Sequence, residues 1–302
     1  MLPLRSVRNC GLAAAVSLAL AAIFMGQGAA AQGMALPYET SVTKTGAARY
    51  SIPIAVAPGT AGIAPPLALT YDSQAGNGLL GMGWQLEGLP SIGRCPRTVA
   101  TDGVHGGVAF DANDRFCLDG QRLIAISGVY GAEGTEYRTE IESFTKVISH
   151  GIAGTGPAWF EARSKSGQRM EFGNSADSRI MQQSTTTARA WAVNKVADTK
   201  GNYFTVSYAN SSSQTYPTRI DYTGNAAAGL VPYNSVRFVY QTRPDDVPAF
   251  LGGASMRTTM RLTNLQIYAE ESLARKTGDT YTTEIRKTFA NKADAREYET
   301  KL

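Results

Sequence analysis

Short runs in which apolar and polar residues alternate recur along much of the chain. A period of two is typical of a half-buried β-strand, because successive side chains point to opposite faces of a sheet. The clearest runs are Ala48–Ile52, Leu67–Tyr71, Tyr203–Tyr208 and Val236–Tyr240. No amphipathic helix of ordinary length is indicated between Gln32 and Tyr268. The pattern predicts an all-β protein of many short antiparallel strands, arranged as a sandwich, a barrel or a propeller-like assembly. No fixed-period repeat supports a regular propeller.

Turn-forming residues separate these runs. Asp102-Gly103 and Asp119-Gly120 are typical of tight hairpin turns, and Lys200-Gly201-Asn202 is typical of a looser turn. Asp111–Asp114 begins like a calcium-binding loop but lacks the turn glycine and the bidentate Glu at the required offsets. We therefore expect a solvated turn there, followed by a strand at Phe116.

The first 31 residues have the pattern of a secretory signal peptide. Arg5 and Arg8 precede an apolar run from Gly11 to Met25, and Ala29–Ala31 supplies the small residues that signal peptidase needs. The alternative is a retained membrane anchor, but the apolar run of about 15 residues is shorter than the roughly 20 that span a bilayer. We expect cleavage after Ala31, no membrane span afterwards, and a periplasmic or extracellular protein.

Composition changes again near the C-terminus. The segment 271–302 contains six acids and seven bases, so 13 of its 32 residues are charged, against 18% for the whole chain. This predicts a charged tail, helical or disordered. The expected organisation is thus a signal peptide (1–31), a β domain (32–270) and a charged tail (271–302).

Charge and cysteine content limit the possible classes of protein. The low charged fraction excludes a coiled coil and a charge-driven disordered chain, and the net charge of +4 does not call for a nucleic-acid partner. Removal of Cys10 with the signal leaves Cys95 and Cys117, and two cysteines in an exported protein favour a disulfide over two buried thiols. His105 and His150 have no ligand-pair spacing, so a metal site has little support.

One glycine motif matches the pattern of a dinucleotide site. Gly76-Asn77-Gly78-Leu79-Leu80-Gly81 fits G-x-G-x-x-G and follows a predicted strand. Such a site needs a helix whose N-terminus holds the pyrophosphate, and Gly83 and Pro90 follow too soon for one. The motif therefore predicts a glycine-rich turn packed under Trp84. The chain has no nucleophile elbow, Walker lysine loop or His-Glu-x-x-His motif.

Several longer stretches, in the same order along the chain, resemble one known family. They are Pro58–Ile63, Pro66–Trp84, Ile92–Pro96, Asp114–Leu123, Glu136–Glu140, Asp198–Asn202 and Ile220–Thr223. These stretches resemble the Salmonella virulence plasmid 65 kDa B protein family, which is shared with the B components of insecticidal toxin complexes. The resemblance covers roughly residues 46–268. It implies structural roles for the motif residues Gly76, Gly78, Gly81, Gly83, Trp84, Asp119, Gly120, Asp198, Gly201 and Asn202.

The resemblance also implies a fold and a role. It implies a sandwich or part of an Rhs-type β shell, and a non-enzymatic scaffold module at the front of a secreted toxin or virulence protein. The implied partner is another toxin-complex or Rhs-type polypeptide, either a C component or a payload, and no cofactor is expected. Two alternatives remain open: a cell-surface adhesin or glycan-binding module, and a hydrolase whose carboxylate pair the sequence does not single out.

Overall fold

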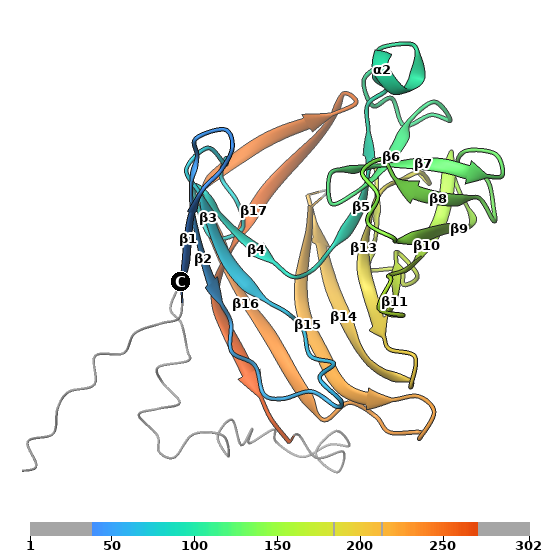
Figure 1. Cartoon of the computed structure of the whole chain (residues 1–302). Helices are drawn as coiled ribbons and strands as arrows, with labels where there is room; N and C mark the ends of the chain where they lie inside the picture. The colour runs from blue at the N-terminus through green and yellow to red at the C-terminus, as the bar shows by residue number, and fades with distance from the viewer. Residues whose placement is uncertain (1–37, 184, 213, 271–302) are drawn as a thin grey trace, which may run out of the picture. The chain divides into compact units, whose positions relative to one another are not determined.

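The computed structural model describes residues 38–183, 185–212 and 214–270, and nearly all of their regular secondary structure is β-strand (Figure 1). The all-β prediction is confirmed. The expected signal peptide and charged tail lie outside the described residues. Within the described part of the chain, no helix has the length and apolar character needed to cross a membrane.

Eight antiparallel strands close into a barrel. The ring closes because the long strand β13 pairs with β5 through Trp191 and Ile92, and with β11 through Lys195 and Glu171. The eight strands are β5 (Ser91–Cys95), β6 (Arg115–Leu118), β7 (Gln121–Ser127), β8 (Glu136–Thr139), β9 (Lys146–Ala153), β10 (Gly156–Arg163), β11 (Arg169–Phe172) and β13 (Ala188–Ala197). A closed ring leaves none of these eight strands as a free edge over its paired length.

Large aromatic side chains fill the barrel. Trp191, Phe116, Tyr137 and Phe160 are at most 2% exposed. The rings of Phe116 and Phe160 meet that of Trp191 edge-on, with centroids 5.4 and 4.9 Å away, a favourable geometry for aromatic pairs. The Trp191 indole N–H donates to the Pro157 carbonyl (3.2 Å), so its polar atom is satisfied inside the core.

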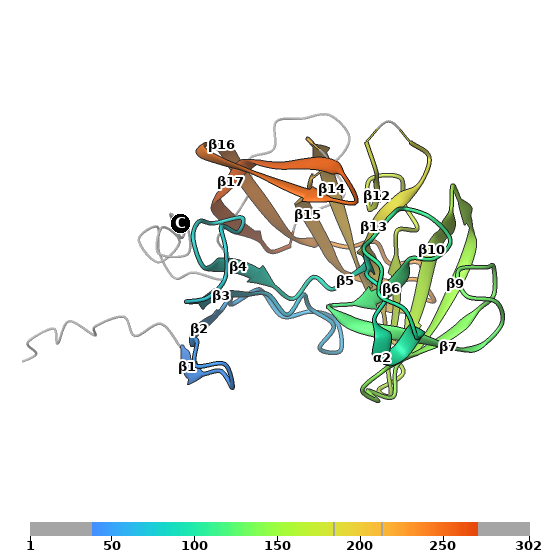
Figure 2. The ribbon, with the colours of Figure 1, turned by 90° about the horizontal axis from the view of Figure 1, so that it is seen from above.

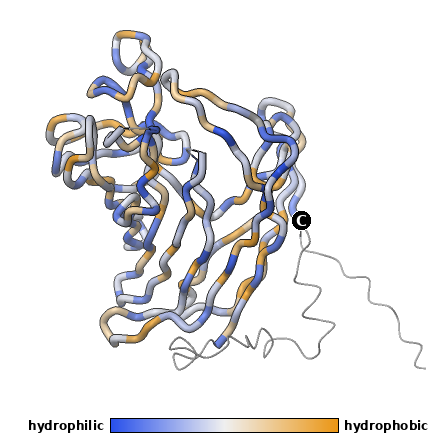
Figure 3. The backbone as a smooth tube through the Cα atoms, turned by 180° about the vertical axis from the view of Figure 1, so that it is seen from behind, coloured by the Kyte–Doolittle hydropathy of each residue, from blue (hydrophilic) through white to orange (hydrophobic). Residues whose placement is uncertain are grey.

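The sheet continues beyond the barrel as a meander. From β13 the order runs through β14 (Asn202–Ser211), β15 (Gln214–Asn225), β16 (Asn234–Leu251) and β17 (Ala254–Tyr268), and the short strand β12 (Arg179–Met181) also pairs with β13. Apolar and polar residues are mixed along these strands (Figure 3). This mixture is expected of strands with one buried face.

A separate four-stranded sheet faces the meander (Figure 2). Its strands are β1 (Glu39–Val42), β2 (Ala48–Pro53), β3 (Ala68–Asp72) and β4 (Trp84–Glu87). Leu67 and Leu69 belong to the same buried core as Ile220 and Val236 of the meander. The two sheets therefore pack as layers of a sandwich in the unit that begins at Tyr38.

Two local expectations from the sequence are wrong. Asp102-Gly103 does not form a hairpin: Asp102 ends the short helix α2 (Val99–Asp102), and Gly103 caps it in the left-handed conformation (φ 70°). An Asp-Gly pair suits both structures because each needs a residue with positive φ. The second concerns the turn at Asp111–Asp114: it forms before β6, with Ala112 and Asn113 exposed, but Asp114 is not solvated. Asp114 is 3% exposed and paired with Arg94 inside the molecule.

Candidate functional site

The glycine motif forms the loop between β3 and β4, and no helix begins there. Two backbone hydrogen bonds close the loop on itself: Gly78 N donates to Gly81 O (3.0 Å), and Gly83 N donates to Gly76 O (2.9 Å). These bonds occupy the amides of Gly78 and Gly83, which are therefore not free to bind a phosphate. The loop is therefore a compact turn and not an anion cradle.

Two positions in this loop require glycine. A Cβ at Gly78 would overlap the carbonyl oxygen of Trp84. Gly83 has a φ of +78°, and a Cβ there would lie 2.5 Å from the Tyr71 ring. The Trp84 ring is half-buried, with its centroid 5.4 Å from that of Tyr71. Close contact with a backbone carbonyl at Gly78, and with an aromatic ring at Gly83, thus explains these two glycines.

A buried arginine from β16 anchors the glycine loop. The Arg243 side chain is 0% exposed. Its guanidinium donates to Gly78 O (3.0 Å) and Asn77 Oδ1 (2.5 Å) of the loop, and to Asp245 Oδ1 (3.0 Å) on its own strand. Hydrogen bonds from Arg243 and Asn77 hold the pKa of Asp245 well below its usual range. This contact joins the four-stranded sheet to the hairpin of β16 and β17.

The second group of motif residues lies where β6 turns into β7. A disulfide joins Cys95 of β5 to Cys117 of β6, with their Cα atoms 6.0 Å apart. In the turn that follows, Asp119 accepts a hydrogen bond from Ser91 N (2.8 Å) and Gly120 has a φ of +80°. Burial raises the pKa of Asp119 and outweighs this hydrogen bond. The disulfide and the hydrogen bond from Ser91 to the turn thus both fasten β5 to β6.

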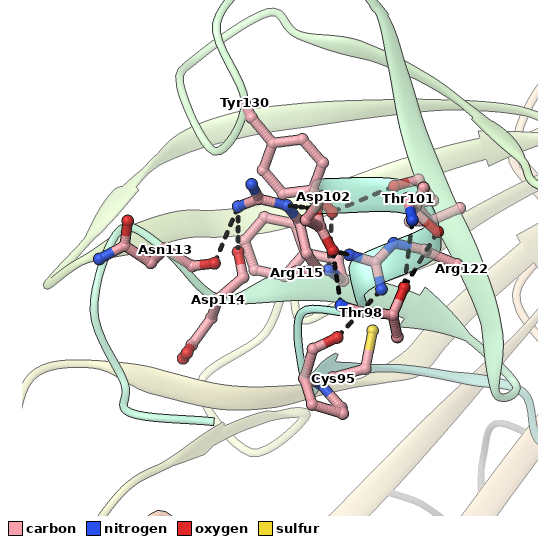
Figure 4. Close-up of polar contacts among 12 residues, drawn as sticks. Cys95, Thr98, Thr101, Asp102, Asn113, Asp114, Arg115, Arg122 and Tyr130 are labelled. Atoms are coloured by element: carbon pink, nitrogen blue, oxygen red, sulfur yellow. Dashed lines mark hydrogen bonds and ion pairs between the residues drawn. The ribbon is translucent and has the colours of Figure 1, made fainter. Parts of the chain in front are cut away.

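Beside the disulfide, two arginines converge on one carboxylate (Figure 4). Asp102 of α2 accepts hydrogen bonds from Arg115 Nε (2.7 Å), Thr98 N (2.8 Å) and Arg122. Burial opposes ionisation of Asp102, but the Thr98 hydrogen bond and the two arginines prevail and lower its pKa. Arg115 also lies over the Tyr130 ring, 4.7 Å from its centroid. The carboxylate stays ionised and is fully engaged, as expected of a structural anchor rather than a general base.

An open pocket of about 530 Å³ lies next to this cluster. Its walls are α2, the disulfide, the turn at Gly120 and the residues Glu140 and Ile141. Arg122 is the cationic group in the wall, and Asp102 already neutralises it. The pocket therefore has no free positive charge from Arg122 to offer an anionic ligand.

A further ion pair, between Arg94 and Asp114, is buried beside the aromatic core of the barrel. Arg94 and Asp114 are 0% and 1% exposed at their side chains, with N–O 3.0 Å. Arg94 Nε donates to Ala188 O (2.8 Å), and its guanidinium lies 5.7 Å from the centroid of the Phe116 ring. Asp114 also accepts from Ala109 N (2.8 Å). Additional hydrogen bonds of this kind offset the desolvation cost of burying two charges.

The third group of motif residues forms the turn between β13 and β14. Asp198 accepts hydrogen bonds from Lys200 N (2.8 Å), Asn202 N (2.9 Å) and Asn202 Nδ2 (2.7 Å). These hydrogen bonds outweigh burial and lower the pKa of Asp198. Gly201 supplies the left-handed residue (φ +85°), and Asn225 of β15 donates to Asn202 Oδ1 (2.7 Å). The hydrogen bond from Asn225 thus also ties this turn to β15.

The three groups of motif residues therefore occupy three separate turns. Within residues 38–183, 185–212 and 214–270, no cluster of three or more His, Cys, Asp or Glu side chains could hold a metal ion. The polar groups described above bond to protein partners, so the arrangement positions strands.

Sequence reasoning missed the anchoring role of Arg243 and the burial of Arg94 and Asp114. Arg243 is a charged residue inside a strand, and its loop partners Asn77 and Gly78 precede it by more than 160 residues. The only local signal is the Asp residue two positions later, with which it pairs.

A family model described as Salmonella virulence plasmid 65kDa B protein (SpvB) matches residues 42–227. The chain belongs to the SpvB family. The matched residues include the glycine loop, the disulfide and the Asp198–Asn202 turn. The predicted resemblance is confirmed, and the chain contains a module related to those of toxin and virulence proteins.

Solved structures share the fold of this SpvB-family chain. The crystal structure of TcdB2-TccC3 matches with a TM-score of 0.66 at 19% identity, over 83% of this chain and 15% of that chain. The Photorhabdus luminescens Tc holotoxin pore matches with a TM-score of 0.63 at 19% identity, over 85% of this chain and 15% of that chain. The chain thus spans about 15% of the length of these toxin-complex chains.

A third match has a size similar to that of the present chain. The N-terminal domain of effector protein SpvB from Salmonella typhimurium strain LT2 matches with a TM-score of 0.59 at 20% identity, over 76% of this chain and 90% of that chain. A search of curated proteins gives no match.

Proposed function

We propose that the chain is an exported, non-enzymatic scaffold module of a toxin or virulence system, which contributes strands to a β shell around another polypeptide. Membership of the SpvB family and the fold shared with toxin-complex proteins support this role. The engagement of Asp102, Asp114 and Asp198 with protein partners supports a structural rather than a catalytic use of these carboxylates.

The single observation that best supports the scaffold role is that the outer edge of β17 has no paired strand among the described residues. β17 is 15 residues long and is the last strand of the meander, and no described strand pairs with it on its outer side. Among the described residues, three β17 amides bond outside the β16 ladder: Arg257 N donates to Ser212 O, Thr259 N to the Tyr216 hydroxyl, and Leu262 N to Leu79 O. Residues 263–268 have no such bond within the described part of the chain. A long edge with unpaired N–H and C=O groups is a template for another strand.

The proposed partner is an Rhs-type polypeptide, either a C component or a payload, whose strand extends the sheet at β17. One solved structure that shares the fold combines TcdB2 with TccC3, which supports a partner polypeptide of this kind. Export through the signal peptide 1–31 would bring the module to the periplasm or the cell exterior.

Hydrogen exchange tests the edge directly. In the isolated full chain, amides of residues 263–268 should exchange faster than those of residues 203–205 in β14, which pair with both β13 and β15. Addition of an Rhs-type polypeptide from the producing bacterium should slow exchange at 263–268 and leave residues 203–205 of β14 unchanged. Slow exchange at 263–268 without a partner, or no change on its addition, would refute strand addition at this edge.

Export needs a separate measurement. The intact mass of the native product, taken from secreted and periplasmic fractions, should correspond to a chain whose first residue is Gln32. A product that retains residues 1–31 would refute export by signal cleavage.

A further inference from the structure

The loop between β8 and β9 displays two large apolar side chains to solvent. Ile141 is 73% exposed and Phe144 is 64% exposed. On the flanking strands, Tyr137 and Val147 are 0% exposed. The strand residues next to the loop, Tyr137 and Val147, thus point inward, while Ile141 and Phe144 of the loop point outward. Exposed clusters of this kind mark interaction sites more often than single exposed residues do.

Phe144 also has an unfavourable backbone conformation. Its φ is +58°, a region that bulky L-residues rarely adopt. Phe110 shares this φ, but Phe110 is 7% exposed and lies against Gly252, so packing accounts for its conformation. Phe144 lies outside the hydrophobic core, and Lys165 Nζ lies 5.9 Å from the centroid of its ring. Strain without an internal packing reason is characteristic of functional positions.

Hydrogen bonds hold the loop in this shape. Thr139 Oγ1 accepts from Ser143 N (3.3 Å) and shares a hydrogen bond with Ser143 Oγ (2.8 Å). Phe144 N donates to Glu142 Oε1 (2.5 Å). Both exposed apolar residues therefore lie in a loop that is already ordered, which lowers the entropy cost of binding.

The charges of the loop indicate what it binds. On the neighbouring strands, Glu136 and Glu161 each pair with basic side chains. Glu140 and Glu142, on either side of Ile141, form no ion pair within the described part of the chain, and Glu140 accepts one hydrogen bond, from Thr101 (3.4 Å). Two unpaired carboxylates beside apolar anchors favour a partner with basic groups around an apolar pocket.

We propose that the loop Glu140–Phe144 is a docking site for a polypeptide that offers an apolar pocket rimmed by Lys or Arg side chains. Ile141 and Phe144 fill the pocket, and Glu140 and Glu142 meet the basic rim. An anionic membrane surface fits less well, because the two carboxylates would be repelled by its lipids. The site is separate from the edge of β17, so either proposal can fail without the other.

Site-specific crosslinking in the producing bacterium identifies the occupant. The full chain carries a benzophenone amino acid at position 144, and a control chain carries it at position 250, where Phe250 of β16 is 71% exposed. The expected result is a crosslink specific to position 144 on a segment that contains apolar residues and Lys or Arg. An equal yield at both positions, or a captured segment without basic residues, overturns the proposal.

Binding of a synthetic peptide with the crosslinked sequence then tests the chemistry. Ile141→Ser with Phe144→Ser, and separately Glu140→Gln with Glu142→Gln, should each weaken binding at least ~10-fold, the charge pair most strongly at low salt. Phe250→Ser should leave binding unchanged. Equal binding by all variants overturns the proposal, as does preferential binding of the chain to phosphatidylglycerol vesicles or self-association that Phe144→Ser abolishes.

A stability measurement distinguishes docking from a structural role. Phe144→Gly should raise the melting temperature, because glycine adopts positive φ without strain, while it weakens peptide binding. A lower melting temperature would mean that the Phe144 ring stabilises this fold, and would overturn the docking role.

Discussion

Replacement of Arg243 by Met tests whether one buried side chain joins the glycine loop to the meander. Methionine retains most of the apolar stem but removes the hydrogen bonds to Gly78 O and Asn77 Oδ1. Hydrogen bonds to a charged group contribute about 1.5–3 kcal/mol each, so loss of the two bonds to the loop costs about 3–5 kcal/mol. Since the Arg243 side chain is 0% exposed, we expect Arg243→Met to lower the free energy of unfolding by about 3–5 kcal/mol.

Urea unfolding of the purified chain measures this loss, and Arg257→Met is the matched control. Arg257 lies on the same hairpin and pairs with Asp246, but its side chain is 56% exposed. Removal of an exposed pair should cost less than about 1 kcal/mol. Amides of the 76–83 loop should also exchange faster in Arg243→Met only. If the two variants lose the same stability and the loop exchange is unchanged, Arg243 is not the anchor.

Three further predictions concern the other turns and clusters. Replacement of Cys95 and Cys117 by Ser should lower the free energy of unfolding by about 3 kcal/mol, since the disulfide closes a loop between residues 22 positions apart. Urea unfolding measures the loss, and two alkylated thiols in a non-reducing peptide map would contradict the pairing. Gly83→Ala should destabilise by about 2–4 kcal/mol, through positive φ and overlap with a tyrosine ring. The control Gly76→Ala meets nothing within 4 Å and should cost well under about 1 kcal/mol, so equal costs would contradict the packing argument. The pKa of Asp102 is lowered in the folded state from 3.8, so its contribution to stability is present above about pH 4 and is lost as pH falls through the folded pKa. The melting temperature of the wild type should therefore fall more than that of Asp102→Asn on acidification below about pH 4, and parallel curves would disprove the linkage.

Local alternation located strands well but not their lengths. The run Val236–Tyr240 lies within β16, which extends from Asn234 to Leu251. The pairing register with β17 shifts between Thr242 and Val247, so the period of two is lost in mid-strand. An irregularity of this kind depends on the partner strand, and a single strand's sequence does not reveal it.

The glycine motif was recognised from sequence, whereas its anchor was not. Gly83 and Pro90 disfavour a helix after Gly81, so the sequence predicted a turn at this position. The dependence of that turn on Arg243 is not local. Arg243 follows Gly78 by 165 positions. An arginine within a predicted strand is expected to be solvent-exposed unless its distant partners are known.

The sequence by itself determined the all-β class, the turns at Asp119-Gly120 and Asp198–Asn202, and the family, because side-chain period and turn chemistry act over a few residues. Only the tertiary structure decided that β13 closes a barrel by pairing with both β5 and β11, and that Arg94 and Asp114 are buried together. A period of two shows which residues share a face of a strand, but it does not show which strands are neighbours. Ring closure and charge burial depend on those neighbours, and therefore on the folded chain as a whole.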